Sequence, residues 1–549
     1  MENNRNNAKR TKGLIICGVL LLSVVSASWT LSDRPLNNHE CFVSITAREM
    51  LESGDWTRPT CNGEPRLQKT PLSYWLVAGL AKITGRVDEL TTRLPSVIFA
   101  VLSVGAILYF VNQWLTFRIA VISAGVWATS LGYIRYAHSA RPEMALTFFV
   151  LLCFLSFYSA ITEKNRNRQV VYMLVFWISF ALGNLAKGPA PLPLVLIPLF
   201  FYVAIFRQWK KLFNWVSVVG LIIFLAIVLP WPLAIAHKLN WDLSLWKQEF
   251  VDRFFGDYDS GSDSFCYYLP MMFLFILPWV AFLPMAIAAP FFKVWAHKRQ
   301  AMLFLWILFI ADFAFLSLWG VGNRQHYILP IMPMMAILIG VLIEDMVFVQ
   351  KAYTQKYARD VLRNHVVAVI IAAIAGIIYV IKTNPQLLIG TIILGTATIV
   401  IIAVTAVLFA RRKHAFACGA TFTGIVVLVM IAYVVFVNPL NYNQPSKQFA
   451  QIVAKKVPAS EKLIAYKSAS TRFIHYFGRP VPEIKTKSEV DKLYNEGRWV
   501  VAFGEYLNEL LQNGQFGIVY MQEDTDGNKG ENVGGALLHK SATIVKDRT

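Results

Sequence analysis

The sequence predicts an α-helical protein that crosses a membrane about thirteen times and ends in a small soluble α/β domain. Of its 549 residues, 56% are hydrophobic and only 15% are charged. Uncharged apolar runs recur along most of the chain, and many are long enough to cross about 30 Å of hydrocarbon. The runs stop after Pro439. An ordinary soluble globular protein is therefore excluded.

The first predicted span, 13–31, follows a basic stretch that contains Lys9, Arg10 and Lys12, as a secretory signal peptide would. Because no convincing small-residue cleavage site follows, we expect a retained helix. Further apolar runs predict the remaining spans. They cover residues 94–117, 119–134, 144–162, 170–186, 189–206, 212–236, 265–292, 301–320, 327–349, 366–381, 386–410 and 415–439.

Basic residues gather in every second connection between these runs. Since cytoplasmic loops of membrane proteins are rich in lysine and arginine, the pattern predicts a cytoplasmic N-terminus in a bacterial inner membrane. An odd number of spans then puts the C-terminal region outside, in the periplasm. The formal net charge of +19 reflects this orientation, and we expect no nucleic acid partner. The basic connections carry Arg118, Lys164, Arg166, Arg168, Arg207, Lys210, Lys211, Lys293, Lys298, Arg299, Lys351, Lys356, Arg359, Arg363, Arg411, Arg412 and Lys413.

The long outer loop after the first span, residues 33–93, predicts two helices that lie in the membrane interface. Apolar residues recur in it at near-helical spacing. We assign this loop to a transmembrane domain that covers residues 1–440. The apolar residues are Phe42, Ile45, Ala47, Met50 and Leu51 in the first helix, and Leu72, Trp75, Leu76, Leu80 and Ile83 in the second.

Residues 441–549 predict a soluble domain on the outer side. Strand-like runs alternate there with helical ones, which is typical of a small α/β fold. The strand-like runs are 463–466, 499–503 and 517–521, and the helical ones are 447–456 and 488–495.

The six cysteines show neither a CxxC motif nor the paired spacing of zinc ligands. The sequence therefore indicates no certain cofactor and leaves a divalent metal ion open. Cys41 and Cys61 share the first outer loop and could form a disulfide in an oxidising compartment. Two free thiols are the favoured interpretation.

Charged residues near the outer boundary are the candidates for chemistry. His39 and Glu40 open the first interface helix, and Glu143 opens the fourth span. The positive end of a helix dipole explains a carboxylate at a helix start equally well. Lys69 and Lys187 lie in outer segments against the orientation trend, so a bound anion explains them better than a solvated surface does.

Three further charges are more ambiguous. Arg253 has Asp252 and Glu249 nearby, so a surface salt bridge explains it equally well, and Arg324 is a similarly weak candidate. Asp312 falls inside the ninth span, where an unpaired charge is costly. It is therefore either functional or paired with a cation on a neighbouring helix.

An ordered set of motifs in the membrane region carries a resemblance to a known family. The motifs are His39–Glu40, Ala47–Leu51, Gly54–Trp56, Pro59, Asn62–Gly63, Lys69–Leu72, Tyr74–Trp75, Arg93–Ser96, Ala186–Pro189, Tyr327–Pro330 and Pro333. On these residues the chain resembles the ArnT-like aminoarabinose lipid A transferases of the protein O-mannosyltransferase clan. That clan belongs to the GT-C superfamily, of the glycosyltransferase family 39 type.

The resemblance implies a GT-C fold and transfer of a sugar, with inversion, from a polyprenyl-phosphate donor such as undecaprenyl phosphate. The acceptor would be a lipid, glycan or protein at the outer leaflet. A base must be an oriented, partly desolvated carboxylate, and we favour Glu40 over Glu143 because His39 could hydrogen-bond to it. The candidates for binding the donor phosphate are Lys69, Lys187, Arg253, Tyr327 and, less strongly, Arg324.

The chain departs from the family at four positions. His39 stands where relatives have an aspartate, and Gln68 stands where they have a glutamate before the lysine. Glu143 replaces an aspartate, and Asn323 replaces a lysine often seen before Tyr327. These substitutions leave the sugar, aminoarabinose-like or hexose-like, and the acceptor open.

Two other classes of function remain as alternatives beside a protein O-mannosyltransferase. A lipid-linked-sugar flippase or transporter would place charges and Gly/Pro breaks near the bilayer midplane. Here the charges cluster at one face, which favours the enzyme. A structural membrane protein leaves the outer lysines unexplained. We expect a monomer.

Overall fold

The computed structural model describes most of the chain. It covers residues 2–242, 266–319, 323–350, 385–437, 445–513, 516–522 and 534–542, with a few residues between 244 and 247 and between 356 and 383. The predicted span 366–381 lies mostly outside the described residues, as does Arg253.

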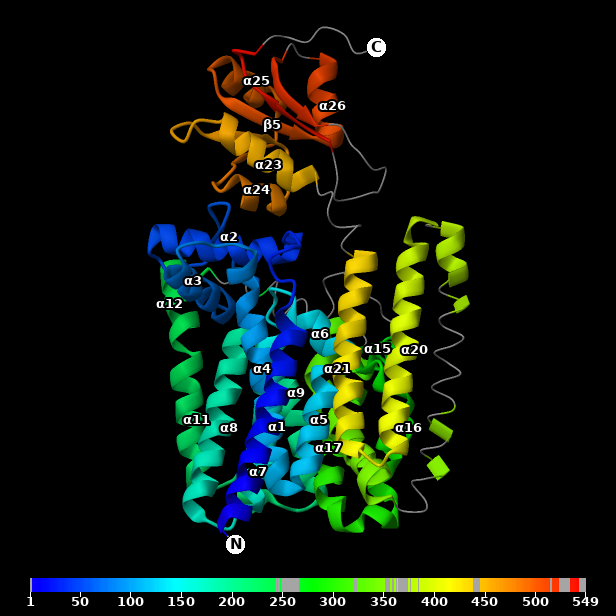
Figure 1. Ribbon diagram of the computed structural model, residues 1–549. Helices are drawn as coiled ribbons and strands as arrows, with labels where there is room; N and C mark the ends of the chain where they lie inside the picture. The colour runs from blue at the N-terminus through cyan, green and yellow to red at the C-terminus, as the bar shows by residue number, and fades with distance from the viewer. Residues whose placement is uncertain are drawn as a thin grey trace. The chain divides into compact units, whose positions relative to one another are not determined.

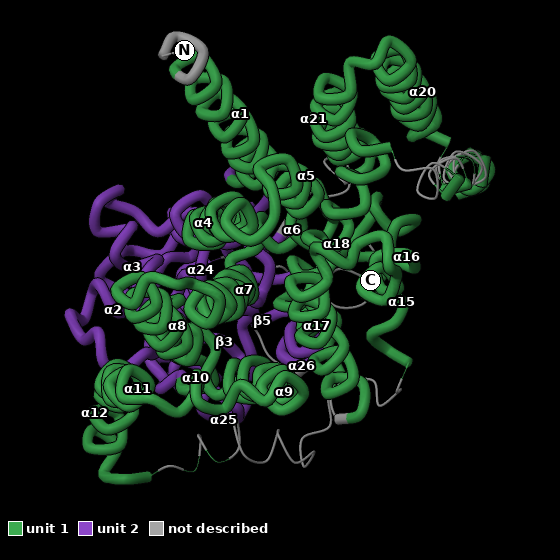
Figure 2. Tube along the Cα trace, turned by 90° about the horizontal axis from the view of Figure 1, so that it is seen from below, with its two compact units in different colours: residues 1–31, 67–73, 93–438 green, residues 32–66, 74–92, 439–549 purple. Residues whose placement is uncertain are grey.

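The chain divides into two compact units, which Figure 2 colours separately. Unit 1 contains Met1–Leu31, Leu67–Ser73 and Arg93–Asn438. Unit 2 contains Ser32–Arg66, Tyr74–Thr92 and Pro439–Thr549. Most of the predicted first outer loop therefore belongs to the same compact unit as the C-terminal region, although the two are far apart in sequence.

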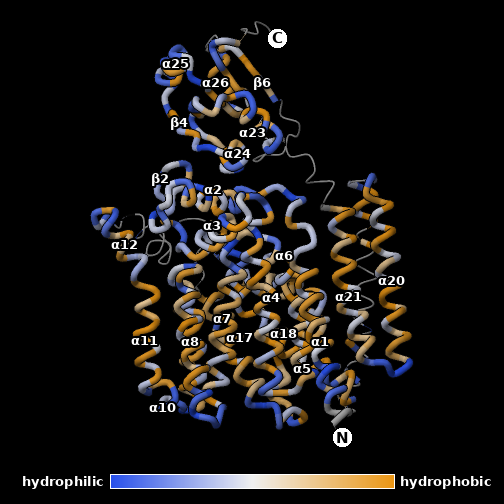
Figure 3. The backbone as a smooth tube through the Cα atoms, turned by 60° about the vertical axis from the view of Figure 1, so that its left-hand side comes forward, coloured by the Kyte–Doolittle hydropathy of each residue, from blue (hydrophilic) through white to orange (hydrophobic). Residues whose placement is uncertain are grey.

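Unit 1 is a bundle of apolar helices that run side by side (Figure 1). Figure 3 shows apolar residues along these helices and polar residues at their ends. The helices are α1 (Glu2–Ser28), α4 (Glu89–Trp114), α5 (Phe117–Ala128), α6 (Leu131–Ala137), α7 (Glu143–Thr162), α8 (Arg166–Lys187), α9 (Pro191–Ile205), α10 (Trp209–Leu212), α11 (Trp215–Val228), α12 (Pro230–Lys238), α15 (Tyr268–Ile276), α16 (Leu283–Ala288), α17 (Arg299–Trp319), η5 (Gln325–Ile331), α18 (Met332–Glu344), α20 (Leu388–Ala410) and α21 (His414–Ala432).

The chain is a multi-pass membrane protein, but the expected thirteen spans are not reached among the described residues. Nine helices there are long and apolar enough to cross a membrane, or up to eleven if each of two bent pairs is one span. The bends, of 59° after Ala128 and 114° after Ile276, interrupt runs that hydropathy alone reads as continuous. Helix α9 is shorter than the span predicted for it.

Helix α18 forms the centre of unit 1 and is buried along its whole length. It packs closely against α5 at Gly340. A Cβ at this position would lie 2.1 Å from Ser123 Oγ and 2.9 Å from the Ser123 backbone nitrogen. Since backbone atoms cannot move aside as a flexible side chain can, the contact requires glycine.

We therefore expect Gly340→Ala to lower the thermal stability of the detergent-solubilised protein. Overpacking of this kind costs on the order of 1–3 kcal/mol. Gly395→Ala on α20 is the matched control, because a Cβ there meets nothing within 4 Å. Equal melting temperatures for the two variants would show that α5 and α18 do not approach this closely.

The C-terminal part of unit 2 is built on a five-stranded mixed sheet in the order β4-β3-β5-β7-β6. Strands β3, β4 and β5 are parallel, and β7 pairs antiparallel with both β5 and β6. Three of the strands form where the sequence predicts strand-like runs. The strands are β3 (Leu463–Tyr466), β4 (Glu483–Ile484), β5 (Trp499–Phe503), β6 (Ile518–Gln522) and β7 (Gly535–Leu538).

Helices cover both faces of this sheet because its strands are apolar on both sides. In β3, Leu463 and Ala465 pack into one core with helices α23 (Pro445–Lys456) and α24 (Thr471–Phe477). Ile464 and Tyr466 pack into the other core with α25 (Lys487–Asn495) and α26 (Gly504–Asn513). The sheet is thus the middle of three layers.

Helices α2 (Asn38–Ser53) and α3 (Leu72–Thr84) form where the interface helices are predicted, but protein covers much of their apolar surface. Ile45 of α2 lies in the core shared with α23 and α24. Ala47 and Met50 pack instead against α3. The helical spacing was identifiable from the sequence. The residues that cover the apolar side of α2, however, lie several hundred positions later in the chain.

Buried polar contacts fasten α2 to α24. Ser44 Oγ lies 2.9 Å from His475 Nδ1, and Arg48 Nη1 donates to the carbonyl oxygen of His475 at 3.0 Å. Farther along, the Arg472 Nε–H donates to the carbonyl oxygen of Leu36. All six cysteines are free thiols, with Cys41 buried in the core beside this contact, which agrees with the favoured interpretation.

Burial and the nearby Arg48 charge lower the pKa of His475 to about 4. In an unfolded chain the imidazole has a pKa of about 6.5. Below that pH the unfolded state binds a proton that the folded state excludes, so the stability of unit 2 should fall as pH falls from about 6.5 towards 4. At about 1.4 kcal/mol per pKa unit, the loss is roughly 3 kcal/mol.

Hydrogen–deuterium exchange of α2 and α24 peptides, corrected for the intrinsic effect of pH, measures this loss in the whole protein. His475→Gln removes the titrating group and should flatten the pH dependence. If the variant and the natural chain respond to acid alike, His475 is not the origin of the effect.

Candidate active site

Glu143 lies at the start of α7 and is almost fully buried, at 4% exposure. It opens this helix after Pro142, whose N-cap position has no side-chain capping bond. Its Oε1 atom contacts a lysine and a histidine, and its Oε2 atom has no hydrogen-bond partner among the described residues. A buried carboxylate is costly unless it is paired, so these two neighbours determine whether it stays ionised.

Lys187 is the first of these neighbours. Its Nζ donates to Glu143 Oε1 at 3.2 Å, and both side chains are at most 10% exposed. Nζ also lies 5.1 Å from the centre of the Tyr327 ring, within the range of a cation–π contact. The pair is therefore a buried ion pair with an aromatic wall.

His326 is the second neighbour. Its Nε2 atom lies 3.4 Å from Glu143 Oε1, and its ring meets that of Tyr327 edge to face. The ring of Tyr136, from α6, lies 6.5 Å from the His326 ring, measured between ring centres. Glu143, Lys187 and His326, which come from α7, α8 and η5, form what we call the Glu143 cluster.

The segment that contains Lys69 is tied to the same place through its neighbour. Gly188, directly after Lys187, has φ +62°, a backbone conformation that residues other than glycine rarely adopt. Its N–H donates to Thr70 Oγ1 at 2.9 Å. The backbone segments that carry the two predicted phosphate-binding lysines therefore lie side by side.

Two arginines add positive charge around the cluster. The charge of Arg141, from the turn before α7, acts on Glu143 together with that of Lys187. The carbonyl oxygen of Arg324 accepts a hydrogen bond from the Tyr327 N–H, so the Arg324 backbone is fixed beside the predicted tyrosine. The cluster thus concentrates cations around one carboxylate.

Glu40 and His39 belong to unit 2, where Glu40 stabilises its own helix. Its Oε2 accepts the Asn37 N–H at 3.0 Å, while its own N–H donates to Asn37 Oδ1 at 3.1 Å. This reciprocal pair is a capping box. Glu40 is fully buried, and Arg34 Nη2 lies 3.7 Å from its Oε1 atom.

Asp312 of α17 is also fully buried, but neither of its carboxylate oxygens has a hydrogen-bond partner in the described part of the chain. No cation pairs with it in that part of the chain, contrary to one of the two expectations from the sequence. It does not belong to the Glu143 cluster.

Sequence reasoning missed His326. The signal was present, because His326 directly precedes the Tyr327–Pro330 motif and follows Arg324 by two residues. A lone histidine next to an apolar run is usually structural, and only the fold brings its ring to Glu143. Within the described residues, no group of three or more His, Cys, Asp and Glu side chains could hold a metal ion.

A carboxylate with one oxygen available, buried among cations, can accept a proton or position a cation for an incoming anion. Lys187 can neutralise a phosphate, and the backbone segment that carries Lys69 lies beside it. The site therefore suits a reaction in which a hydroxyl loses a proton while a phosphate departs.

Comparison with known families adds to this picture. Residues 68–233 match the family model described as dolichyl-phosphate-mannose-protein mannosyltransferase. This region contains Lys69, Glu143 and Lys187.

Similar proteins include several undecaprenyl phosphate-alpha-4-amino-4-deoxy-L-arabinose arabinosyl transferases. That of Pseudomonas aeruginosa strain LESB58 is 28% identical over 317 residues, 56% of each chain. That of Pseudomonas fluorescens strain Pf-5 is 26% identical over 371 residues, 64% of this chain and 60% of the relative. The matched stretch thus spans little more than half the length of these relatives.

Solved structures show the fold. ArnT from Cupriavidus metallidurans bound to undecaprenyl phosphate superposes with a TM-score of 0.81 at 17% identity, covering 97% of this chain and 99% of that one. The same protein in the apo state gives 0.77 at 18% identity, covering 97% and 98%. The chain therefore has the fold of ArnT throughout, and part of its membrane region is similar in sequence to the mannosyltransferase family model and to the arabinosyl transferases.

Proposed function

We propose that the chain is an integral-membrane glycosyltransferase. It moves a sugar, aminoarabinose-like or hexose-like, from a polyprenyl-phosphate donor to a lipid, glycan or protein acceptor at the outer leaflet. The observation that carries the proposal is the Glu143 cluster, in which a buried carboxylate beside a lysine keeps one oxygen without a hydrogen-bond partner among the residues that the structure describes. The arabinosyl transferases named above, with their undecaprenyl-phosphate sugar donor, support the donor class.

In the proposed reaction the acceptor hydroxyl attacks the anomeric carbon from the face opposite the phosphate. The new C–O bond forms as the bond to the phosphate oxygen breaks, so the configuration inverts. The hydroxyl proton passes to a carboxylate, and the polyprenyl phosphate leaves with its added negative charge. Lys187 and Lys69 stabilise that charge, because cations placed where charge develops lower the barrier.

We place the base at Glu143 rather than at Glu40, against the preference from the sequence. Both oxygens of Glu40 are engaged in its own unit, one in the capping box and one near Arg34. Glu143 offers Oε2, which has no hydrogen-bond partner in the described part of the chain. When Lys187 turns to the donor phosphate, Glu143 Oε1 also loses its ion-pair partner, so the carboxylate can accept the proton of the acceptor hydroxyl. His326 keeps this carboxylate in place.

An apolar groove of about 500 Å³ in unit 1 suits the prenyl chain. Helix α9 lines it with Ile197, Phe201 and Ile205, and α17 lines the other side from Trp306 to Leu318. Helix α9 begins shortly after Lys187, and α17 ends shortly before Arg324. The groove thus leads from the helix ends near the Glu143 cluster along the membrane-spanning surface.

The proposed location is a bacterial inner membrane, with the N-terminus in the cytoplasm and the C-terminal region in the periplasm. The alternation of basic connections supports this orientation, which puts the Glu143 cluster on the outer side. We propose a monomer that works without a nucleic acid partner. Arg253 remains a candidate phosphate ligand, and Tyr327 positions the phosphate or the sugar through its place beside Lys187.

The test of the base begins with mass spectrometry of envelope glycolipids and glycoproteins from cells with and without the gene, which identifies the product. Glu143→Gln keeps the shape but cannot accept a proton, so transfer should fall by a factor on the order of a hundred to ten thousand. Lys187→Ala and Lys69→Ala should each lower transfer at least about a hundredfold.

Two controls accompany these variants at matched protein level. Glu163→Gln changes a glutamate at the opposite end of α7 and should leave transfer unchanged. Glu40→Gln should retain most turnover. If Glu40→Gln abolishes transfer while Glu143→Gln keeps it, the base is Glu40 and the role of Glu143 is to pair Lys187.

The groove makes a separate prediction about chain length. Ala314→Trp fills the groove, so KM for an undecaprenyl-phosphate donor should rise roughly tenfold, about 1.4 kcal/mol. A donor with a geranyl chain, which is too short to occupy the groove, should be affected little. Ala403→Trp on the exposed side of α20 is the control. An equal rise in KM for both donors would exclude the groove as the binding site of the prenyl chain.

A further inference from the structure

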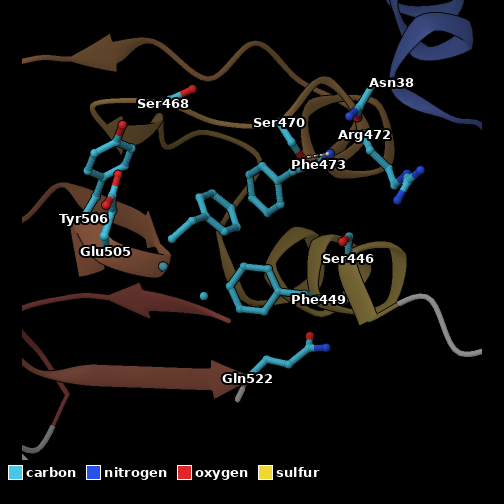
Figure 4. A pocket seen from close by; sticks show the side chains of 13 residues that line it. Asn38, Ser446, Phe449, Ser468, Ser470, Arg472, Phe473, Glu505, Tyr506 and Gln522 are labelled. Atoms are coloured by element: carbon cyan, nitrogen blue, oxygen red, sulfur yellow. Dashed lines mark hydrogen bonds between the residues drawn. The ribbon is translucent and has the colours of Figure 1, made fainter. Parts of the chain in front are cut away.

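Unit 2 contains a second cavity, of about 450 Å³, which the proposed transfer chemistry does not use (Figure 4). Pockets that bind small molecules in proteins measure about 300–1,000 Å³. The cavity opens between α23, α24 and the strand ends of the sheet. Its lining is Asn38, Ser446, Phe449, Ser468, Ser470, Arg472, Phe473, Phe503, Gly504, Glu505, Tyr506, Gln522 and Gly535.

The cavity lies where the topology of the sheet favours a binding site. The adjacent parallel strands β3 and β5 end there, and the segments after both strands line it. After β3 the chain continues into α24 on one face of the sheet, whereas after β5 it continues into α26 on the other face. Where the connections of neighbouring strands diverge in this way, a crevice opens at their carboxyl ends, and ligands bind in such crevices.

Aromatic rings form one wall of the cavity. The rings of Phe449 and Phe473 each lie within 6 Å of the Phe503 ring, measured between centres. Gly535 makes room for them, because a Cβ there would come within 2.8 Å of Phe503. Figure 4 shows the rings of Phe449 and Phe473 facing the same space, with Tyr506 at its side. Flat apolar rings of this kind pack against the C–H faces of a sugar ring.

Polar groups complete the lining without building a strong charge. Gln522 Oε1 is buried and has no hydrogen-bond partner in the described residues, so it offers an acceptor to a ligand hydroxyl. Hydroxyls of Ser468 and Tyr506 and the carboxylate of Glu505 stand nearby. The guanidinium of Arg472 already donates to the Leu36 carbonyl. A ligand with many hydroxyls and no negative charge fits this set best.

We propose that this cavity binds a saccharide, neutral or amino-substituted. Saccharide binding is inferred from the cavity alone. That the bound saccharide is the sugar portion of the acceptor rests on the proposed transfer function, since an acceptor must be held while its hydroxyl is brought to the donor. Sulfated, phosphorylated and purely aliphatic ligands match the lining poorly, because the first two would meet Glu505 and the third would leave Gln522 unsatisfied.

The test uses the full-length protein in lipid nanodiscs, which avoid sugar-based detergents. Saturation-transfer NMR with maltose, chitobiose and methyl glucosaminide should show binding of at least one probe in the millimolar range. Tyr506→Ala and Gln522→Leu should each weaken that binding at least about tenfold, because each removes a direct contact. Gln512→Leu, on the exposed side of α26, should leave it unchanged.

Glu143→Gln separates this inference from the proposed function, since it should abolish transfer and leave saccharide binding intact. In the transfer assay, Gln522→Leu should raise KM for the acceptor with little change in kcat. Two results would overturn the inference: no probe binds the natural chain, or both cavity variants bind as well as Gln512→Leu does. If Tyr506→Ala folds poorly, the comparison of Gln522→Leu with Gln512→Leu alone decides whether the cavity binds the saccharide.

Discussion

The cost of burying charge is the constraint on which unit 1 depends. Glu143 sits almost without solvent at the end of a membrane-crossing helix, where an isolated carboxylate would not remain ionised. Lys187 and His326 offset that cost from two other helices, so the start of α7, the end of α8 and the distant η5 must meet at one point. A pair of this kind adds little to stability relative to apolar residues, but breaking it leaves an uncompensated charge. The cluster is therefore better understood as a functional feature than as a structural brace.

The cost of burying charge also distinguishes the role of Glu40 from that of Glu143. Glu40 is as buried as Glu143, yet its oxygens are satisfied locally by Asn37 and Arg34 in a helix-start arrangement. Local satisfaction fixes the beginning of α2 and leaves the carboxylate little capacity for another partner. Among the described residues, Glu143 has long-range partners on one oxygen, and its other oxygen has no hydrogen-bond partner. Long-range pairing can be exchanged for a ligand, whereas a capping box can be broken only by fraying the helix.

The core of unit 2 is also assembled from segments that are far apart in the sequence. Its parallel strands leave a crevice at their carboxyl ends, and the helix α2 of the first outer loop packs onto the same region through Ser44, Arg48 and the Ile45 side chain. A segment that the amphipathic pattern assigns to the membrane surface therefore completes a protein core. Two cores, one on each face of the sheet, hold the loops after β3 and β5 apart, and the cavity is the space between them.

The sequence by itself determined where the apolar helices run, where strands begin in the C-terminal region, and that Lys69, Glu143 and Lys187 are unusual for their positions. These features are local, because hydropathy and spacing need only neighbouring residues. The tertiary structure decided which charges meet, since Glu143, Lys187 and His326 are separated by tens to nearly two hundred positions. Nine to eleven of the thirteen expected spans are found in the described chain. Two of them are bent, α9 is shorter than its predicted span, and the span 366–381 lies mostly outside the described residues. Long-range packing, which no local pattern encodes, is the reason that the side chains of Glu143, Lys187 and His326 meet.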